Sequence, residues 1–436
     1  MNINTQRMVD RYAGQMLCAG LSLWHRCRPN KVAPRTAPRD ALQADSDQPF
    51  QPRAIAILML SEMGSMVLAQ PMVGYLKERY PDADLHVVQL GKNQEIVRLL
   101  GFAKSEHMHA IDDSSLFKLL GSLYRVIRDL RRAGVDAVID CELFARISSC
   151  IAYLSGASRL AGFTPHTQEG LYRGSFINCA VPYNPYRAIK EQFMSLARAL
   201  DKPSQTLPRS KQAAIGFASD ARFEALQPLA LREGELVAAV SKLQNHFPQV
   251  GNQPLVLLYP GGGILPIRAW PEDYFATTAK ALLDAGCAVG FIGLPVDKPL
   301  AQSLVGKLTS TADAPSAVLD LTGYTQNIRE LLVLFFHAKL LITNDGGPGH
   351  FAALTPIHTI MFFGPETPAL YAPLASSLGG ESVALFAGTP CSPCLTAYNH
   401  RTSSCDGDNV CLQEITPVQV LAHAHRMLGI QLESTP

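Results

Sequence analysis

Two Rossmann-like, doubly wound α/β domains are the fold that the sequence predicts, and three observations lead to this expectation. The chain has 436 residues, which is too long for one ordinary core and suits two domains of roughly 150–200 residues each. Its 47% hydrophobic and 17% charged residues are typical of a packed globular protein. Apolar runs of strand length alternate with helical patterns in both halves, and that order predicts parallel sheets with right-handed crossovers.

The first predicted domain covers residues 53–215 and follows an N-terminal helix and a linker over residues 1–52. Arg53–Leu60 is a nearly continuous apolar run, as expected of a strand buried on both faces. Pro71 should kink the helix that comes next or mark its start. The other elements expected here are strands at Leu85–Leu90 and Ala137–Cys141 and a helix at Leu116–Ala133.

The second predicted domain covers residues 216–436 and repeats the alternation more clearly. Its strands are expected at Leu255–Tyr259, Ala288–Ile292, Ala317–Leu321, Lys339–Thr343, Thr359–Phe363 and Val383–Phe386. Its helices are expected at Tyr274–Ala285, Ile328–Phe336 and Pro417–Leu428. Doubly wound sheets bind ligands at the carboxyl ends of their strands, so a cleft between two facing domains is the expected active site.

Charge and hydropathy narrow the classes of binding partner and the cellular location expected for the protein. A formal net charge of +1 gives no reason to expect nucleic acid, and no apolar run reaches the roughly 18 residues of a membrane-spanning helix. Met16–Trp24 is apolar but has no cleavage site after it, so we expect a cytoplasmic protein without a secretory signal. Basic residues follow this segment, which predicts either a helix packed on the main body or an anchor at the inner face of the plasma membrane.

A glycine-rich turn at residues 343–350 is the first candidate for a binding site. It lies between a predicted strand and a helix that is expected to start at His350. Gly346 and Gly347 let a ligand approach the backbone, and a helix N-terminus carries a partial positive charge, which together favour a phosphate or diphosphate. Asp345 is better suited to cap the helix or to accept a sugar hydroxyl. The alternative is a tight turn that binds nothing.

A second glycine-rich turn follows another predicted strand of the same domain, at residues 259–263. Both turns should therefore reach one edge of the sheet, where Gly261 and Gly262 would again allow close approach. Arg268 follows this turn and offers a cation that could neutralise a leaving diphosphate. An ordinary surface arginine is the alternative. The two turns together predict a site for a nucleotide-sugar diphosphate.

Five segments, in order along about 300 residues, resemble glycosyltransferase family 9, the ADP-heptose:lipopolysaccharide heptosyltransferases. They are Leu60–Ser65 with Pro71, Ser155–Phe163, Arg268–Pro271, Asn344–Leu354, and Phe363–Pro365 with Pro368. The resemblance implies a GT-B fold and an inverting transfer of heptose or a similar sugar to a lipopolysaccharide-type or other glycan acceptor. It also implies that no metal or other cofactor is required for catalysis. On this basis Asp345, Gly346, Gly347 and His350 would bind the donor, and Arg268 would replace the family's phosphate-binding lysine.

The acceptor side departs from the family pattern at Gly64-Ser65, where the family has Gly-Asp and the aspartate is the proposed general base. A serine cannot deprotonate an alcohol at neutral pH without a base of its own. Glu62, on the same turn, is the first substitute, and Glu142, just after the third predicted strand, is the second. Either glutamate could instead be a structural partner of Arg146 or Arg159. The missing aspartate also admits a non-catalytic relative that binds nucleotide-sugars, and a nucleotide-sugar epimerase or hydrolase of the same architecture is a further alternative.

Four cysteines lie close together in the loop at residues 391–411. Their spacing in a reducing compartment suits a tetrahedral structural zinc site, with a disulfide pair or free thiols as the alternatives. The four residues are Cys391, Cys394, Cys405 and Cys411. The expected partners of the chain are a nucleotide-sugar donor, a glycan or glycolipid acceptor and a membrane surface.

Overall fold

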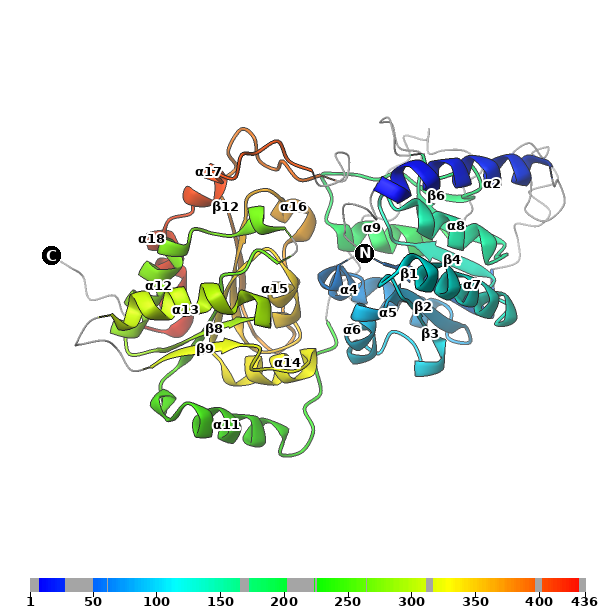
Figure 1. Ribbon diagram of the computed structural model, residues 1–436. Coiled ribbons are helices and arrows are strands. Elements are labelled where there is room, and N and C mark those ends of the chain that lie inside the picture. The colour runs from blue at the N-terminus through cyan, green and yellow to red at the C-terminus, as the bar shows by residue number, and fades with distance from the viewer. Residues whose placement is uncertain are drawn as a thin grey trace. The chain divides into compact units, whose positions relative to one another are not determined.

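The computed structural model describes residues 8–27, 50–60, 62–164, 172–201, 223, 226–263, 265–310, 317–396 and 402–430. The chain divides into two compact units, residues 1–224 and 225–436. Each unit contains a six-stranded parallel sheet with helices packed against it (Figure 1). The predicted domain boundary between residues 215 and 216 lies outside the described residues and stays a prediction. Among the described residues, no helix is both long and apolar enough to cross a membrane.

The first sheet has the strand order β3-β2-β1-β4-β5-β6. This is the order of a Rossmann-type doubly wound sheet, whose direction of winding reverses between β1 and β4. All six residues of β1 are buried, because this strand lies in the middle of the sheet between β2 and β4. The strands are β1 (Ala54–Met59), β2 (Asp84–Leu90), β3 (Met108–Ile111), β4 (Ala137–Asp140), β5 (Arg159–Phe163) and β6 (Cys179–Val181).

The predicted helix break at Pro71 is present in the first unit. One short helix, α4, ends at Leu68, and the next, α5, begins at Gln70 with Pro71 in its first turn, where a proline needs no N–H partner. The helices are α2 (Gln15–Cys27), α4 (Met63–Leu68), α5 (Gln70–Arg79), α6 (Gln94–Leu99), α7 (Leu116–Arg132), α8 (Arg146–Leu154) and α9 (Ile189–Arg198). The shorter turns are η1 (Asp10–Gly14, π), η2 (Gly91–Asn93) and η3 (Ser105–His107).

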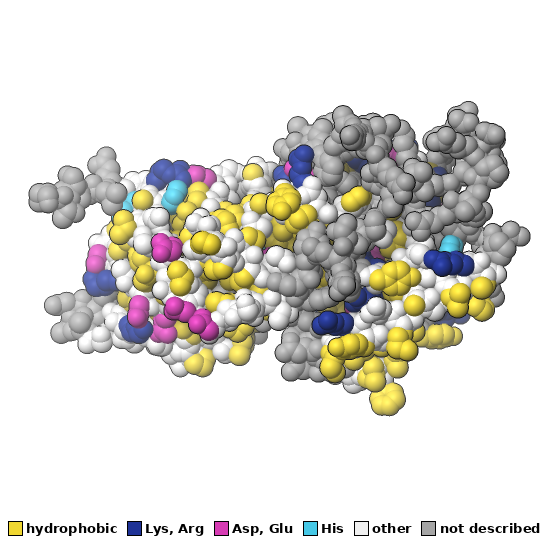
Figure 2. Space-filling model, turned by 90° about the horizontal axis from the view of Figure 1, so that it is seen from above, with side chains coloured by type: hydrophobic (Ala, Val, Ile, Leu, Met, Phe, Trp, Pro, Cys, Tyr) yellow, Lys and Arg dark blue, Asp and Glu magenta, His cyan; other side chains and the backbone are white. Residues whose placement is uncertain are grey.

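The N-terminal helix α2 packs on the first unit against α8, as one of its two alternatives predicts. Its buried positions carry small side chains, Cys18 and Ser22, and η1 before it buries Gly14. Most of its large apolar side chains remain on the surface. Figure 2 shows apolar side chains gathered with Lys and Arg side chains on the surface at the right of the view. Packing on the unit therefore does not account for the apolar residues of this helix.

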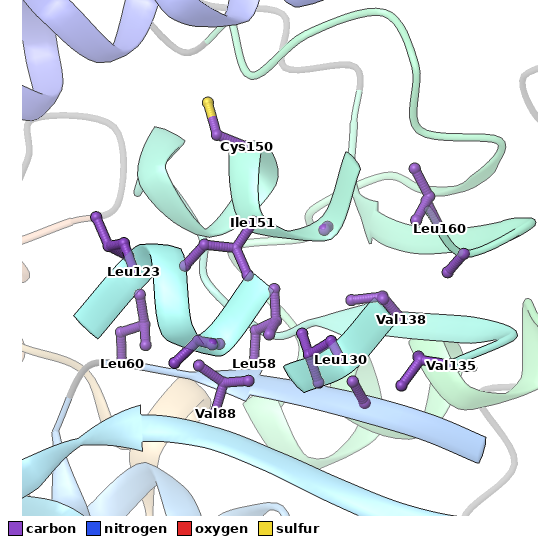
Figure 3. Packing of buried hydrophobic residues seen from close by; sticks show 14 of the residues in the cluster. Leu58, Leu60, Val88, Leu123, Leu130, Val135, Val138, Cys150, Ile151 and Leu160 are labelled. Carbon is purple, nitrogen blue, oxygen red and sulfur yellow. The ribbon is translucent and has the colours of Figure 1, made fainter. Parts of the chain in front are cut away.

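One hydrophobic core joins α7, α8 and α2 to a face of the first sheet. Figure 3 shows this core from close by, with side chains of the two helices α7 and α8 over those of β1, β2 and β4. Cys18 of α2 belongs to the same buried cluster. The labelled members are Leu58, Leu60, Val88, Leu123, Leu130, Val135, Val138, Cys150, Ile151 and Leu160.

The second sheet repeats the same strand order, read as β12-β11-β10-β7-β8-β9. Its winding reverses between β7 and β10, which pair in parallel with Leu341 opposite Leu257. Each of the six strands predicted for this half is present within one residue at either end. They are β7 (Leu255–Tyr259), β8 (Ala288–Gly293), β9 (Val318–Thr322), β10 (Leu340–Asn344), β11 (His358–Phe363) and β12 (Ser382–Phe386).

Helices connect these strands and follow the last of them. The C-terminal helix α18 covers the predicted residues and packs on α12, β10 and β11 of its own unit. The helices are α11 (Glu235–His246), α12 (Glu272–Asp284), α13 (Lys298–Thr309), α14 (Ile328–His337), α15 (Gly347–Ala352), α16 (Pro368–Tyr371), α17 (Val410–Gln413) and α18 (Pro417–Leu428). Short 3₁₀ turns are η4 (Pro248–Val250), η5 (Pro266–Arg268) and η6 (Pro295–Asp297).

Candidate active site

The two glycine-rich turns of the second unit meet at the carboxyl ends of β7 and β10, where the winding of the sheet reverses. Asn344, the last residue of β10, joins them with its side-chain amide. Its Nδ2 donates to the carbonyl oxygens of Pro260 at 2.9 Å and Gly261 at 3.1 Å. Its Oδ1 accepts from the backbone N–H of Trp270 at 2.9 Å. One buried side chain therefore fixes both turns and the start of α12 relative to one another.

Arg268 is buried between two carboxylates at this edge, which excludes the alternative of an ordinary surface arginine. Its Nε lies 3.5 Å from Oδ2 of Asp345, and its Nη2 donates to Oε1 of Glu366 at 3.0 Å. Burial of a charge is costly unless it is paired, so the guanidinium of Arg268 and the two carboxylates offset part of one another's burial cost. Glu366 was not anticipated from the sequence. The indication available was its position just after β11, the strand next to β10.

The helix after the second turn starts earlier than predicted. α15 begins at Gly347, not at His350, because Pro348 fits the first turn of a helix. The residue before the helix is Gly346, so Asp345 is not its N-cap, and that alternative for Asp345 is wrong. Asp345 instead pairs with Arg268. His350 lies buried within α15.

The glycines of the two turns differ in what the fold requires of them. A Cβ at Gly262 would lie 2.7 Å from Cα of Pro266, and one at Gly261 would lie 2.8 Å from Oδ1 of Asp297. Gly262 needs glycine for packing within the chain, because a Cβ there meets backbone atoms, whereas at Gly261 the atoms met belong to side chains. A Cβ at Gly346 would meet no atom closer than 3.8 Å, and its backbone is extended. Packing within the chain therefore gives no reason for glycine at position 346.

Asp297, in the turn after β8, is a further carboxylate at the first glycine turn. Its Oδ2 accepts from the backbone N–H of Leu294 at 2.8 Å. Burial, followed by the charge of Asp297, raises the pKa of Tyr259 to about 12, so the phenol stays protonated. Sequence reasoning missed Asp297, although its position shortly after a buried strand next to β7 was available as an indication.

The three acceptor-side residues of the first unit lie just after β1. Glu62 is half-buried at the N-terminus of α4, and its carbonyl oxygen accepts from the N–H of Ser65 at 3.1 Å. Gly64 is buried and Ser65 is half-buried within this one short helix. The structure thus places the first candidate base on the same turn as the serine that replaces the family aspartate.

Glu142 reaches the same sheet edge from the neighbouring strand β4. Its Oε1 accepts from the backbone N–H of Leu60 at 2.7 Å, and the residue is buried. Both candidate glutamates therefore lie where β1 and β4 end. The hydrogen bond from Leu60 joins Glu142 to the backbone between β1 and Glu62.

The loop that carries Glu142 is held by a buried ion pair between Asp140 and Arg173. Arg173 also donates to the carbonyl oxygens of Glu142 and Ala145. Sequence reasoning missed this arginine. The two arginines proposed as partners of the glutamates have other contacts: Arg146 lies 3.6 Å from a carboxylate oxygen of Asp10, and Arg159 lies over the ring of Phe50.

The four clustered cysteines are free thiols in the structure, so the disulfide alternative is not observed for them. Cys391 and Cys405 are exposed, Cys394 is half-buried and Cys411 is buried. Burial, with smaller contributions from the neighbouring thiols, raises the pKa of Cys411. In the described ranges, which include all four, no three or more His, Cys, Asp or Glu side chains are arranged to hold a metal ion. The structural zinc stays a prediction.

Known proteins similar to this chain belong to the family that the sequence resembles. The model of glycosyltransferase family 9 (heptosyltransferase) matches residues 123–402. Lipopolysaccharide heptosyltransferase 2 of Salmonella typhimurium is 27% identical over 386 residues, which cover 86% of this chain and 98% of the relative. The enzyme of the same name from Escherichia coli is 26% identical over 380 residues, with the same two coverages.

Solved structures show the same fold. The E. coli ADP-heptose lipopolysaccharide heptosyltransferase II superposes with a TM-score of 0.62 at 20% identity, covering 86% of this chain and 98% of that one. A family 9 glycosyl transferase from Veillonella parvula superposes with a TM-score of 0.64 at 18% identity, covering 88% and 99%. The two doubly wound units are those of a GT-B fold. The family match extends over more than half of the chain, and the chain therefore belongs to glycosyltransferase family 9 and is a glycosyltransferase.

Proposed function

We propose that this enzyme transfers a heptose, or a similar sugar, from a nucleotide-diphosphate sugar to a lipopolysaccharide-type or other glycan acceptor, with inversion at the anomeric carbon. Relatives named lipopolysaccharide heptosyltransferase support the reaction class, and the solved relative named for ADP-heptose supports an adenosine diphosphate donor. The single observation that carries the proposal is the buried Arg268 beside two glycine turns that Asn344 holds together.

At the donor end, Arg268 would stabilise the negative charge that develops on the leaving diphosphate. A guanidinium has five N–H donors in a rigid fork, so it can pair with carboxylates and a phosphate oxygen at once. Asp345 would accept a hydroxyl of the donor sugar, and the half-buried backbone at Gly346, which carries no Cβ, would let the diphosphate approach. Charge stabilisation of this kind is worth about 10²–10³-fold in rate for a single preorganised donor.

At the acceptor end, we propose Glu62 as the general base and Glu142 as the residue that positions its turn. The acceptor oxygen forms a bond to the anomeric carbon while the bond from that carbon to the diphosphate breaks, and the base takes the acceptor proton. A base must come within hydrogen-bond reach of that hydroxyl. Glu62 is half-buried and therefore reachable, whereas Glu142 is buried with one oxygen committed to the N–H of Leu60.

The proposed setting is the cytoplasm, at the inner face of the membrane in which a glycolipid acceptor would be embedded. A lipopolysaccharide-type acceptor is an amphiphile, so an enzyme acting on it would meet it at a lipid surface. The proposal uses no metal and no other cofactor for catalysis, and it includes no nucleic acid partner.

The test is a transfer assay with ADP-, GDP- and UDP-sugars and a panel of glycolipid acceptors. We expect ADP-heptose to give a product whose anomeric configuration, read by NMR, is inverted. Nucleotide-sugar binding without turnover for every acceptor would instead indicate a non-catalytic relative. Hydrolysis or epimerisation of the donor without an acceptor would favour the epimerase alternative.

The donor position is tested by Gly346→Ala. The structure has room for this methyl group, so stability should be unchanged while the donor KM rises about tenfold if the diphosphate contacts the turn. Gly306→Ala is the matched control, since a Cβ there has no neighbour within 4 Å and the residue lies in α13. Equal kinetics for both variants would argue against a donor at Gly346.

The base is tested by Glu62→Gln and Glu142→Gln. We expect Glu62→Gln to lower kcat by about 10²–10⁴-fold with little change in donor KM. Glu142→Gln keeps an oxygen that can accept from Leu60 and should cost less. Activity that survives Glu62→Gln but disappears in Glu142→Gln would reverse the assignment.

A further inference from the structure

We propose that η1, α2 and α7 of the first unit form one membrane-binding surface that docks on anionic phospholipid. We call it the lipid-facing surface and define it by the exposed apolar and basic side chains of residues 8–27 and 116–132. The inference rests on the proposed setting at the inner membrane face and deepens it, because it names the surface of this chain that would contact the lipid. Its test needs neither donor nor acceptor, so its failure and the failure of the proposed transfer reaction can be told apart.

The N-terminal segment presents apolar side chains on the side that is not packed. A helix on a globular protein ordinarily buries its large apolar residues and exposes its polar ones. Here Gly14, Cys18 and Ser22 form the buried stripe, and a Cβ at Gly14 would lie only 2.9 Å from Cβ of Arg146. The exposed large apolar side chains are Met8, Val9, Tyr12, Met16, Leu17, Leu23 and Trp24, of which Met16 is 77% exposed.

Helix α7 has a second exposed apolar stripe beside a row of cations. It buries Leu123, Val126 and Leu130 in the core and leaves its opposite side to solvent. The exposed apolar residues recur at helical spacing at Leu116, Phe117, Leu120 and Tyr124, and Phe117 is 87% exposed. The helix also carries five cationic side chains, Lys118, Arg125, Arg128, Arg131 and Arg132, against one acidic side chain, Asp129.

The two stripes belong to neighbouring elements of one compact unit. Helix α8 contacts both α2 and α7, and all three helices contribute to the same hydrophobic core. Figure 1 shows α2, α8 and α7 as adjacent helices over the first sheet. The apolar and basic side chains at the right of Figure 2 lie over this unit. A flat partner could therefore engage residues of both helices.

The chemistry of the surface fits a lipid headgroup region. Trp24, Tyr12 and Tyr124 combine an apolar ring with a polar group, the property that places Trp and Tyr at membrane interfaces. The cations of α7 complement anionic headgroups, and Arg11 and Arg26 add to them on the N-terminal segment. Apolar side chains mixed with an excess of cations are the pattern of interfacial helices that lie on a membrane.

The first experiment measures co-sedimentation of the full chain with vesicles of phosphatidylcholine, alone or mixed with phosphatidylglycerol. We expect at least about tenfold tighter binding to the mixed vesicles, and we expect the difference to shrink at high salt. Phe117→Ser with Tyr124→Ser should weaken binding by about tenfold or more. Tyr186→Ser is the matched control, because Tyr186 is also 87% exposed but lies outside the surface. Arg125→Gln with Arg132→Gln should remove the preference for anionic lipid.

The second experiment uses the tryptophans. The chain has two: Trp24 is 52% exposed on α2, and Trp270 is 2% exposed in the core of the second unit. Mixed vesicles should shift the emission to shorter wavelength, and Trp24→Phe should abolish the shift. Equal binding to both vesicle types, or no binding to either, would overturn the proposal. So would a wild-type dimer in light scattering that Phe117→Ser converts to a monomer, because a second copy of the chain would then cover the surface.

Discussion

The carboxyl edges of the two sheets both contain a buried arginine paired with a carboxylate, but the arginines serve different surroundings. In the first unit Arg173 contacts Asp140 and also donates to backbone carbonyl oxygens, so the protein itself uses the cation. In the second unit Arg268 lies between Asp345 and Glu366, beside two glycine turns. An arginine that donates to backbone carbonyl oxygens supports a loop, whereas one held by side chains beside two glycine turns is suited to bind a ligand.

The largest effect that would test this contrast is expected at Arg268. Arg268→Met removes the cation from the proposed diphosphate site and leaves two buried carboxylates close together. We expect kcat/KM for transfer to fall by about 10³-fold, which corresponds to about 4 kcal/mol. Arg268→Lys keeps the charge and should retain more activity. A methionine variant with normal kcat/KM would make the cluster purely structural.

At Arg173 the expected loss is in stability. Arg173→Met leaves Asp140 buried without its cation, so the free energy of unfolding should fall by about 3 kcal/mol. Urea denaturation followed by the fluorescence of Trp24, which lies in the same unit, measures this. Combining it with Asp140→Asn should recover part of the loss, because the second change removes the unpaired charge. If Arg173→Met were as stable as the wild type, Arg173 would not stabilise the loop after β4.

A smaller effect is expected for Asn344→Ala, which breaks the link between the two glycine turns. The N–H of Trp270 and the carbonyl of Gly261 lose their partner, at a cost of about 2 kcal/mol in the free energy of unfolding. We also expect the donor KM to rise, since the turns are no longer fixed relative to one another. Calorimetric measurement of nucleotide affinity would check this, and unchanged affinity would mean that the turns hold their places without the link.

The effect that is smallest at neutral pH is a pH dependence in the first unit. Burial, followed by the charges of His107 and His109, lowers the pKa of His86 from 6.5 to about 4. As the pH falls, this imidazole is therefore protonated in the unfolded chain before it is protonated in the folded one. Its contribution to the free energy of unfolding is complete above pH 6.5 and is lost as the pH falls toward 4. His86→Gln should flatten this slope in unfolding curves read through Trp24. An unchanged slope would assign it to other groups.

Local sequence was sufficient to predict the strands of the second half, but not all of those in the first. β7, β8, β10 and β11 are buried apolar runs, and β9 and β12 are partly buried apolar runs of five residues. Of the strands that were not predicted, β3 and β6 are only four and three residues long, and β5 has five. Runs this short have no periodicity that distinguishes them from loops. The early start of α15 was predictable in principle, because a proline is favoured in the first turn of a helix.

The parts of the site that sequence reasoning missed are partners distant along the chain. Glu366 is 98 residues from Arg268, and Arg173 is 33 residues from Asp140. Each charge is visible in the sequence, but only the order of strands in a sheet brings the members of a pair together. Gly346 differs in another way, since the sequence shows a glycine without showing whether packing or a ligand requires it. The space around its Cα supplied that distinction.

The small residues that pack the N-terminal helix α2 against α8 also allow the rate at which this helix detaches to be measured. Cys18 on α2 and Cys150 on α8 are buried with their Sγ atoms 3.7 Å apart, while Cys27 at the end of α2 is exposed. An alkylating reagent can reach Cys27 at once but reaches Cys18 only in moments when the helix has lifted from α8. The ratio of the two alkylation rates therefore reports how often α2 detaches from α8.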